Sequence, residues 1–266
     1  FIFSNSPWTI GGPLKKTVIS GEIDNFGGGI IIGDNNEISK ILNTKISYLR
    51  GYNTDLNSEF LIMGSINFHQ TNVRIEGVDF ENIYSEDAIN IVRSSFKIKD
   101  SSYKNIFSDA IDIDFSEGKI ENVVFKNINN DALDFSGSNV EIHNSNFENV
   151  KDKLISGGEE SIINISKIIA INSKSGIISK DGSKVYSRNI FFDNVKVPFA
   201  SYQKKSQYNY GFLEVNDYQA KNFLVKFAKD NKSELIIDNV SQISSENNKK
   251  MISLVNQWIN YDWKNK

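Results

Sequence analysis

The chain has 266 residues, 39% of them hydrophobic, which suffices for one large domain or two small ones. Its 30 lysines and arginines against 33 aspartates and glutamates give a net charge of −3, which argues against a nucleic-acid-binding protein. The absence of cysteine excludes disulfide bonds and thiolate metal sites, and the sequence has no apolar run of about 18 residues that would span a membrane.

The chain begins in the stretch FIFSNSPW, which has the pattern of the middle of a strand, so we expect an attached upstream segment or domain. Further along, the phrase Phe-x-Asn-(Ile/Val), or a close variant, recurs every 22 or 23 residues. Its asparagines are Asn82, Asn105, Asn127, Asn149, Asn172 and Asn194. A fixed period of this length indicates a repeat architecture.

Within each repeat, short runs of alternating apolar and polar residues are separated by Asn, Ser, Asp and Gly, as in KIENVVF and AIDIDF. The alternation predicts three short strands per repeat, and 22 residues are too few for a two-helix repeat. We therefore predict an all-β fold, a single-stranded parallel β-helix with roughly nine rungs stacked about 4.8 Å apart. Residues 1–240 are assigned to this solenoid, and residues 241–266 to a C-terminal capping helix and tail.

Stacking brings equivalent residues of successive rungs into columns. The main inward column is predicted to contain Ile89, Ile111, Leu133, Leu154, Ile177 and Phe199. The repeated asparagines are predicted to form an internal ladder, in which each amide bonds to the next and satisfies buried turn backbone. Residues 202–211 lengthen one rung and are predicted to form a surface loop.

The last predicted element is an amphipathic helix near the C-terminus. Met251, Leu254, Val255 and Trp258 have helical spacing, and Ser245 is a candidate N-cap. An open terminal rung exposes apolar core and strand edges, so we expect this helix to cover the last rung. An oligomer contact and a membrane-surface anchor are the alternative roles.

Two copies of Asp-Ala-(Ile/Leu)-Asp, at 109–112 and 131–134, place carboxyl groups on neighbouring rungs. Because the isoleucines of AIDIDF face inward, Asp112 and Asp114 face outward. Asp134 then lies beside Asp112, one rung later. Two charges 5 Å apart repel by roughly 1 kcal/mol in water and by more in a less polar medium, so we expect a bound ligand, a metal ion or a raised pKa to offset the repulsion.

Further polar residues are predicted to share this surface, and together with the aspartates they form a candidate functional site. The catalytic candidates are Asp112, Asp114, Asp134 and Lys180, and the substrate-binding candidates are Tyr202 and Asn90. Asp112 and Asp134 also form a candidate Ca²⁺ site, because Ca²⁺ prefers carboxylate oxygens. The aspartates that begin the strands are predicted to cap turn N–H groups instead, and these are Asp87, Asp109, Asp131 and Asp152.

The sequence leaves the chemistry open between three interpretations. Carboxyl groups on adjacent rungs would lie about 5 Å apart, near the retaining glycosidase distance, whereas residues two apart on one strand would lie about 7 Å apart, near the inverting distance. A polysaccharide lyase would instead use Lys180 as its base and Ca²⁺ to neutralise a uronate. In the third interpretation the aspartates splay into solvent and keep the surface of a structural module soluble.

The run from Glu86 to Val185, which begins EDAINIVRSSFKIKD and includes both Asp-Ala repeats, resembles right-handed parallel β-helices of the pectin-lyase-like superfamily. More narrowly, it is similar to β-helix regions that accompany spore-coat-H-like kinase modules in bacterial surface proteins. The resemblance covers about residues 17–225 and implies a right-handed parallel β-helix.

The superfamily contains pectate lyases, polygalacturonases, alginate lyases, epimerases, phage tailspikes and non-catalytic members, and many of them act on acidic polysaccharides. The resemblance therefore implies a secreted or cell-surface bacterial protein that binds, or binds and cleaves, a polysaccharide. A non-catalytic accessory module of a larger surface protein is the alternative. Asn53-Thr54-Asp55 matches a polygalacturonase motif, but no Asp-Asp pair, Gly-His-Gly or Arg-x-Lys follows it, so no polygalacturonase role is assigned.

Overall fold

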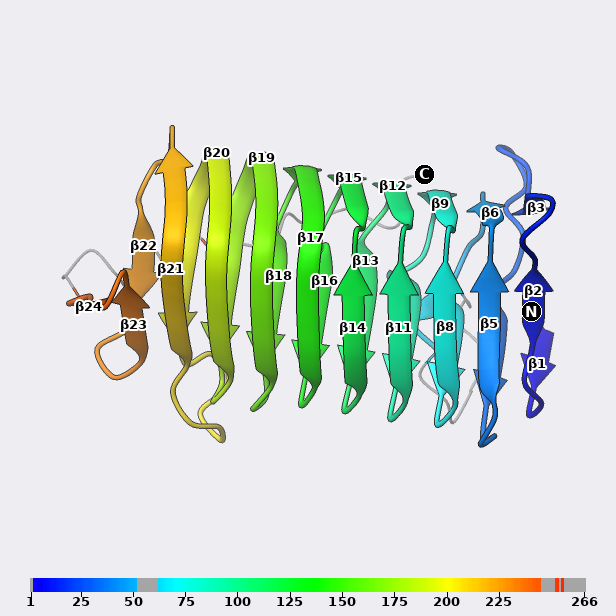
Figure 1. Cartoon of the computed structure of the whole chain (residues 1–266), viewed down its shortest axis with the longest axis horizontal. Helices are drawn as coiled ribbons and strands as arrows, with labels where there is room; N and C mark the ends of the chain where they lie inside the picture. Colours follow the sequence, from blue (N-terminus) through cyan, green and yellow to red (C-terminus); the bar gives the residue numbers. More distant parts are fainter. Residues whose placement is uncertain (1, 52–61, 245–251, 254, 256–266) are drawn as a thin grey trace.

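In the computed structural model, which describes residues 2–51, 62–244, 252, 253 and 255, each turn of the chain adds strands to three parallel sheets (Figure 1). The sheets run along the axis of a right-handed parallel β-helix of about nine turns. The predicted fold class is therefore confirmed. The polygalacturonase-like motif Asn53-Thr54-Asp55 lies outside the described residues.

We name the sheets by their order in each turn. Sheet I contains β1 (Ile2–Ser4), β4 (Ile30–Gly33), β7 (Gly64–His69), β10 (Asp87–Val92), β13 (Asp109–Asp114), β16 (Leu133–Ser136), β18 (Lys153–Gly158), the C-terminal parts of β19 (Ile162–Lys180) and β20 (Lys184–Tyr202), and β22 (Phe227–Lys229). Sheet II contains β2 (Thr9–Gly11), β5 (Ile38–Leu42), β8 (Asn72–Glu76), β11 (Ser95–Lys99), β14 (Glu117–Glu121), the N-terminal parts of β17 (Asn139–Val150), β19, β20 and β21 (Phe212–Lys221), and β23 (Glu234–Ile237). Sheet III contains β3 (Thr17–Ser20), β6 (Thr44–Ser47), β9 (Asp79–Ile83), β12 (Ser102–Ile106), β15 (Val124–Ile128) and the C-terminal parts of β17, β19, β20 and β21. β24 (Val240–Ser241) pairs antiparallel with β23, and residues 252, 253 and 255 are helical.

Apolar side chains of all three sheets fill the interior of the coil. The aromatic position of the repeated phrase forms one continuous stack of Phe80, Tyr103, Phe125 and Phe147, with ring centroids 4.8, 5.2 and 4.9 Å apart. These separations match the spacing of neighbouring strands, because each ring lies directly above its equivalent in the preceding rung. Aromatic residues that recur with the sequence period therefore stack into one column in the core.

The predicted inward column is correct except at one rung. Leu133 pairs with Ile155, not with Leu154, and Ile155 pairs with Ile177. This one-residue shift places Ser156 beside Asp134 on the outside, where the sequence had suggested an isoleucine. The apolar pair Leu154–Ile155 carries no alternation, so its register was ambiguous from sequence.

The repeated asparagines lie at corners of the coil and adopt left-handed backbone conformations, with φ from 54° to 58°. Asparagine tolerates this region better than most residues, which explains its recurrence. The amide of Asn127 donates to Asn105, and the amide of Asn149 donates to Asn127, each at 2.8 Å. These side chains are half-buried or exposed, so the prediction that they are internal is wrong. The left-handed residue breaks the inside–outside alternation and turns the amide outward.

Serines provide the internal hydrogen bonds between rungs, at the corner that joins sheet I to sheet II. The backbone N–H groups of Ser94, Ser116 and Ser138 donate to the hydroxyls of Ser116, Ser138 and Ser161 at 3.0, 3.0 and 3.1 Å. All these serines are buried. A buried N–H group without a partner is costly, so this row of hydroxyls stabilises the ends of the sheet I strands.

The C-terminal segment contacts the outside of sheet I. Ile252 and Val255 pack with Ile178, Ala200 and Tyr202, which face away from the main core. The predicted helix residues Met251, Leu254 and Trp258, and the candidate cap Ser245, lie outside the described residues, so the cover over the last rung stays a prediction. No helix in the described part of the chain has the length and apolar character needed to cross a membrane.

Candidate functional site

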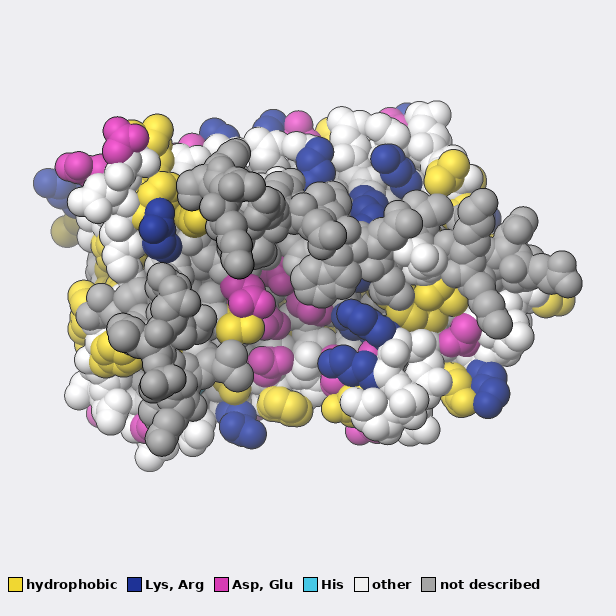
Figure 2. Space-filling model, turned by 180° about the vertical axis from the view of Figure 1, so that it is seen from behind, with side chains coloured by type: hydrophobic (Ala, Val, Ile, Leu, Met, Phe, Trp, Pro, Cys, Tyr) yellow, Lys and Arg dark blue, Asp and Glu magenta, His cyan; other side chains and the backbone are white. Residues whose placement is uncertain are grey.

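Carboxyl groups gather in the middle of the outer face of sheet I, with lysines beside them toward the C-terminal rungs (Figure 2). We call this group the charged cluster, and it consists of Asp87, Asp109, Asp112, Asp114, Asp131, Asp134, Lys153 and Lys180. Its members come from β10, β13, β16, β18 and β19, except Asp131, which lies in the turn before β16. The parallel register places Asp112 between Asn90 and Asp134 on neighbouring rungs.

The N-terminal half of the charged cluster is acidic, and two of its carboxyl groups accept hydrogen bonds from one side-chain amide. Asn90, itself buried, donates from Nδ2 to Asp87 Oδ2 and to Asp112 Oδ2, both at 3.3 Å. Burial raises the pKa of Asp87, Asp109 and Asp112 well above the ordinary aspartate value, and the neighbouring carboxylates raise it further. These three carboxyls therefore favour the protonated form.

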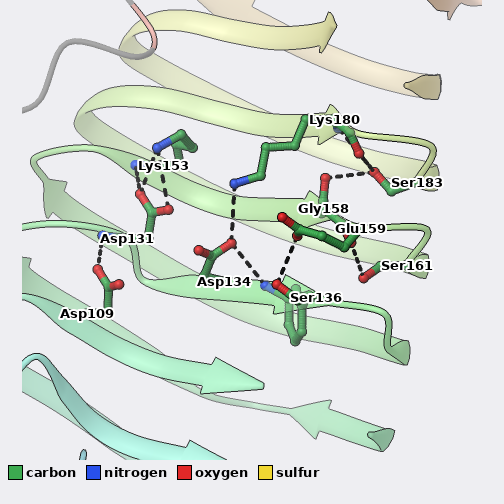
Figure 3. Close-up of polar contacts among 12 residues, drawn as sticks. Asp109, Asp131, Asp134, Ser136, Lys153, Gly158, Glu159, Ser161, Lys180 and Ser183 are labelled. Carbon is green, nitrogen blue, oxygen red and sulfur yellow. Dashed lines mark hydrogen bonds and ion pairs between the residues drawn. The ribbon is translucent and has the colours of Figure 1, made fainter. Parts of the chain in front are cut away.

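The C-terminal half contains two ion pairs (Figure 3). Lys180 reaches back across two rungs, so that its Nζ lies 3.6 Å from Asp134 Oδ1. Lys153 Nζ lies 3.3 Å from Asp131 Oδ1 and also pairs with Asp152. Burial opposes the charged form of Asp134, but the ammonium groups of Lys180 and Lys153 outweigh it and lower the pKa of that carboxyl. Asp134 is therefore the ionised member of the column.

Adjacent carboxyls thus differ in protonation. Asp112 is pushed toward the neutral acid and Asp134 toward the carboxylate, although they occupy equivalent positions on neighbouring strands. Two titratable groups whose pKa values are driven apart can serve as an acid and a base at the same pH. Both side chains are half-buried and keep contact with solvent.

Asp114 lies one column further along the strand, next to a second polar group. Burial raises its pKa, and the Asp134 carboxylate adds to the effect. Opposite it, Ser136 Oγ donates to Glu159 Oε2 at 2.9 Å, and Glu159 pairs with Lys205. Asp114 therefore belongs to the charged cluster but does not share the Lys180 ion pair.

Three of the predicted site residues have environments that change their roles. Tyr202 is fully buried against Ile178 and Val255, so its ring offers no face to a sugar. Asn90 is buried with its amide bound to two carboxyls, so it positions Asp112 and does not face a substrate. For Lys180, burial opposes the charge, but the carboxylate of Asp134 raises its pKa, which makes it a counter-ion and a poor general base.

The geometry does not fit the predicted Ca²⁺ site at Asp112 and Asp134. Asp134 already faces the ammonium of Lys180, and the raised pKa of Asp112 reduces its availability as an anionic ligand. Among residues 2–51, 62–244, 252, 253 and 255, no group of three or more acidic or histidine side chains is arranged to hold a metal ion. Ca²⁺ normally takes six to eight oxygen ligands, and the two carboxyl groups of this pair would supply at most four of them.

Two of the strand-initial aspartates combine the predicted turn capping with a place in the charged cluster that the sequence does not predict. The capping itself is confirmed for both of them, because Asp109 Oδ1 accepts from the backbone N–H of Asp131 at 2.7 Å and Asp131 Oδ1 accepts from that of Lys153 at 2.9 Å. Asp131 is buried and Asp109 is half-buried in this cluster, which alternation alone does not predict. Lys153 follows Asp131 by one period of 22 residues, and this spacing was the signal for the ion pair.

The raised pKa of Asp112 predicts a pH-dependent gain in stability for Asp112→Asn. The folded pKa lies above the unfolded one, so the native protein loses stability as the pH rises above the ordinary aspartate value. Asparagine has no proton to lose and removes this penalty. We expect the thermal midpoint to rise by several degrees at pH 8 and to stay unchanged at pH 4, measured by circular dichroism.

The matched control is Asp24→Asn, which changes an exposed turn aspartate and should leave both midpoints unchanged. If Asp112→Asn destabilised the protein more at pH 8 than at pH 4, then Asp112 would be ionised and held by its neighbours, contrary to this assignment.

Comparisons with known proteins add a likeness of fold. No family model and no curated protein match the sequence. Among solved structures, an alginate lyase from Paenibacillus sp. str. FPU-7 is 12% identical with a TM-score of 0.48, and the match covers 85% of this chain and 86% of that one. A pectate lyase from Paenibacillus sp. 0602 is 12% identical with a TM-score of 0.47, covering 86% and 65%. The catalytic domain of a GH87 α-1,3-glucanase is 10% identical with a TM-score of 0.40, covering 90% and 63%.

This chain therefore spans less than two thirds of the glucanase domain and of the pectate lyase. The fold that the resemblance implied, a parallel β-helix, is the one that the strand pairing shows.

Proposed function

We propose that this protein binds polysaccharide along the outer face of sheet I and hydrolyses it at the charged cluster. Asp112 acts as the general acid and Asp134 as the ionised carboxylate. The observation that carries the proposal is the opposite direction of the two pKa shifts on neighbouring strands. A protonated carboxyl next to an ionised one is the pair that glycoside hydrolysis requires.

The strand spacing favours retention of stereochemistry. Neighbouring parallel strands lie about 4.8 Å apart, which is close to the ~5–5.5 Å that separates the carboxyl groups of retaining enzymes. In the first step Asp134 forms a bond to the anomeric carbon, the bond to the glycosidic oxygen breaks, and Asp112 gives that oxygen its proton. In the second step Asp112 takes a proton from water, which displaces Asp134.

Elimination chemistry fits the cluster less well than hydrolysis. A lysine must be neutral to act as the base of a lyase, and the lysine predicted for that role, Lys180, is held in its charged form by Asp134. The elongated face also suits a polymer, because each rung presents its side chains about 4.8 Å from those of the next. A secreted or cell-surface location is part of the proposal, since long polysaccharides are met there.

One observation favours a second function, a non-catalytic structural module. Asp131 and Lys153 are buried and pair with each other, and the buried Lys180 pairs with Asp134. Such pairs are expected of a network that only neutralises charge between rungs. In that case the cluster would hold the solenoid together and bind no substrate.

The test is turnover of a panel of soluble polysaccharides, which includes neutral glucans and xylan and the uronate polymers alginate and pectate. We expect new reducing ends without unsaturated products. Asp112→Asn and Asp134→Asn should each lower kcat by about 10²–10⁴-fold, whereas Asp24→Asn should not change it. Unsaturated products would contradict hydrolysis, and an inactive wild-type protein would favour the structural module.

A further inference from the structure

Sheet II lies on the opposite side of the coil from sheet I (Figure 1), and its outer face contains a hollow. The hollow crosses β17, β19, β20 and β21 and has a volume of about 500 Å³, within the usual range for ligand sites. Two neighbouring outward columns line it. One column contains Glu141, Asn164, Tyr186 and Glu214, and the other contains His143, Ser166, Arg188 and Asn216.

Tyr186 provides an aromatic platform near the middle of the hollow. Its side chain is 38% exposed, and its ring lies 5.5 Å from the ring of Phe212 at an interplanar angle of 49°. This contact supports the ring from one side and leaves other surface open. A tyrosine held in this way offers a large contact area with little loss of conformational entropy on binding.

Arg188 lies in the adjacent column, two residues after Tyr186 on the same strand. It is exposed, and within the described residues its guanidinium makes no hydrogen bond or ion pair. A guanidinium has five N–H donors in one plane, which can bind two neighbouring oxygen atoms at once. The donors beside Tyr186 are therefore free for a ligand.

The remaining polar groups are held in place and nearly balanced in charge. Glu214 accepts from Asn216 Nδ2 at 2.7 Å, Glu141 pairs with Lys119 at 2.6 Å, and His143 Nδ1 lies 2.8 Å from Ser166 Oγ. One free cation among carboxylates is not a surface for phosphate chains, which need a continuous row of positive charge. Planar acceptors and donors around an aromatic ring suit a ligand with many hydroxyl groups.

We propose that this hollow is a second, non-catalytic binding site for a neutral polysaccharide chain. One sugar ring packs on Tyr186, and Arg188 donates hydrogen bonds to its hydroxyls, while Asn164 and Glu214 contact units on the adjacent rungs. The rungs repeat about every 4.8 Å, so the chain would lie along the axis of the solenoid. This binding does not depend on whether sheet I is catalytic.

The experiment measures binding of Asp112→Asn protein to an array of neutral and uronate-containing oligosaccharides, so that hydrolysis does not interfere. Adding Tyr186→Ala should weaken binding to neutral glycans at least 10-fold, and adding Arg188→Met should weaken it several-fold. Tyr186→Phe should keep most of the binding, because the ring remains. The matched control is Tyr210→Ala, which removes another tyrosine that is also 38% exposed but lies outside the hollow.

Three results would overturn the proposal: no glycan binding by the parent protein, unchanged binding after Tyr186→Ala, or a loss after Tyr186→Ala that is confined to uronate-containing glycans. Thermal unfolding would confirm that each variant is folded. Turnover by the wild-type protein and by Asp134→Asn is measured separately, so a failure of the sheet II site is distinguishable from a failure of the sheet I site.

Discussion

Lys153→Met is expected to lower the free energy of unfolding by about 3–5 kcal/mol, because it breaks a buried ion pair on one side only. The side chains of Lys153 and Asp131 are 7% and 5% exposed, and Lys153 also neutralises Asp152. Methionine fills much of the same space but leaves Asp131 without its counter-ion, whereas Asp152 keeps its ion pair with Lys174 at 2.8 Å. Urea unfolding at pH 7, followed by circular dichroism, measures the loss.

The control for Lys153→Met is Lys119→Met, which breaks an exposed pair. Lys119 lies 2.6 Å from Glu141, but the two side chains are 61% and 58% exposed, so water screens them and the loss should stay below about 1 kcal/mol. Adding Asp131→Asn to Lys153→Met should restore part of the stability, because one unpaired carboxylate is removed. Equal losses at positions 153 and 119 would show that burial adds nothing to the pair.

The sequence was sufficient to predict the solenoid, because the fold requires the same types of side chain at equivalent positions of every rung, and these side chains recur with a visible period. A left-handed corner residue and a stacked aromatic recur together, as in Phe125 and Asn127, and each copy demands the same local structure. The alternation inside AIDIDF then fixed which residues face outward. Those two signals placed Asp112 beside Asp134 correctly.

Other features could not be predicted because they depend on contacts between segments. Outward-facing positions were treated as exposed, yet Ile178 and Tyr202 are covered by Val255, which comes from the far end of the chain. No local sequence pattern predicts that a distant segment will cover part of a sheet. Burial of this kind removed Tyr202 from the set of residues that can meet a substrate.

The electrostatics of the cluster were also beyond the sequence pattern. The predicted columns show only which residues are neighbours on successive rungs. A lysine side chain is long enough to pass over a rung, as Lys180 does to reach Asp134. The consequence is a cluster with little repulsion. Its buried acids favour the neutral form at one end, and its carboxylates meet lysines at the other. The lysines and the neutral acids therefore reduce the expected repulsion.

Lys180→Met is expected to weaken both the fold and the activity proposed for sheet I. Its ion pair with Asp134 is less buried than that of Lys153, since Asp134 is 28% exposed, so we expect a loss of about 2–3 kcal/mol. Lys180 lowers the folded pKa of Asp134, and this contribution is present above the unfolded pKa and is lost as the pH falls. Without Lys180, burial dominates and the pKa of Asp134 rises.

The activity profile then separates this role from a general loss of structure. Because Asp134 must be ionised, the acid limb of kcat/KM against pH should move to higher pH in Lys180→Met, so that turnover falls more at pH 5 than at pH 7. Lys180→Arg keeps the positive charge and should keep the acid limb near its original position. An acid limb that does not move in Lys180→Met would mean that Asp134 is not the ionised partner of Asp112, and the assignment of acid and carboxylate on sheet I would fail.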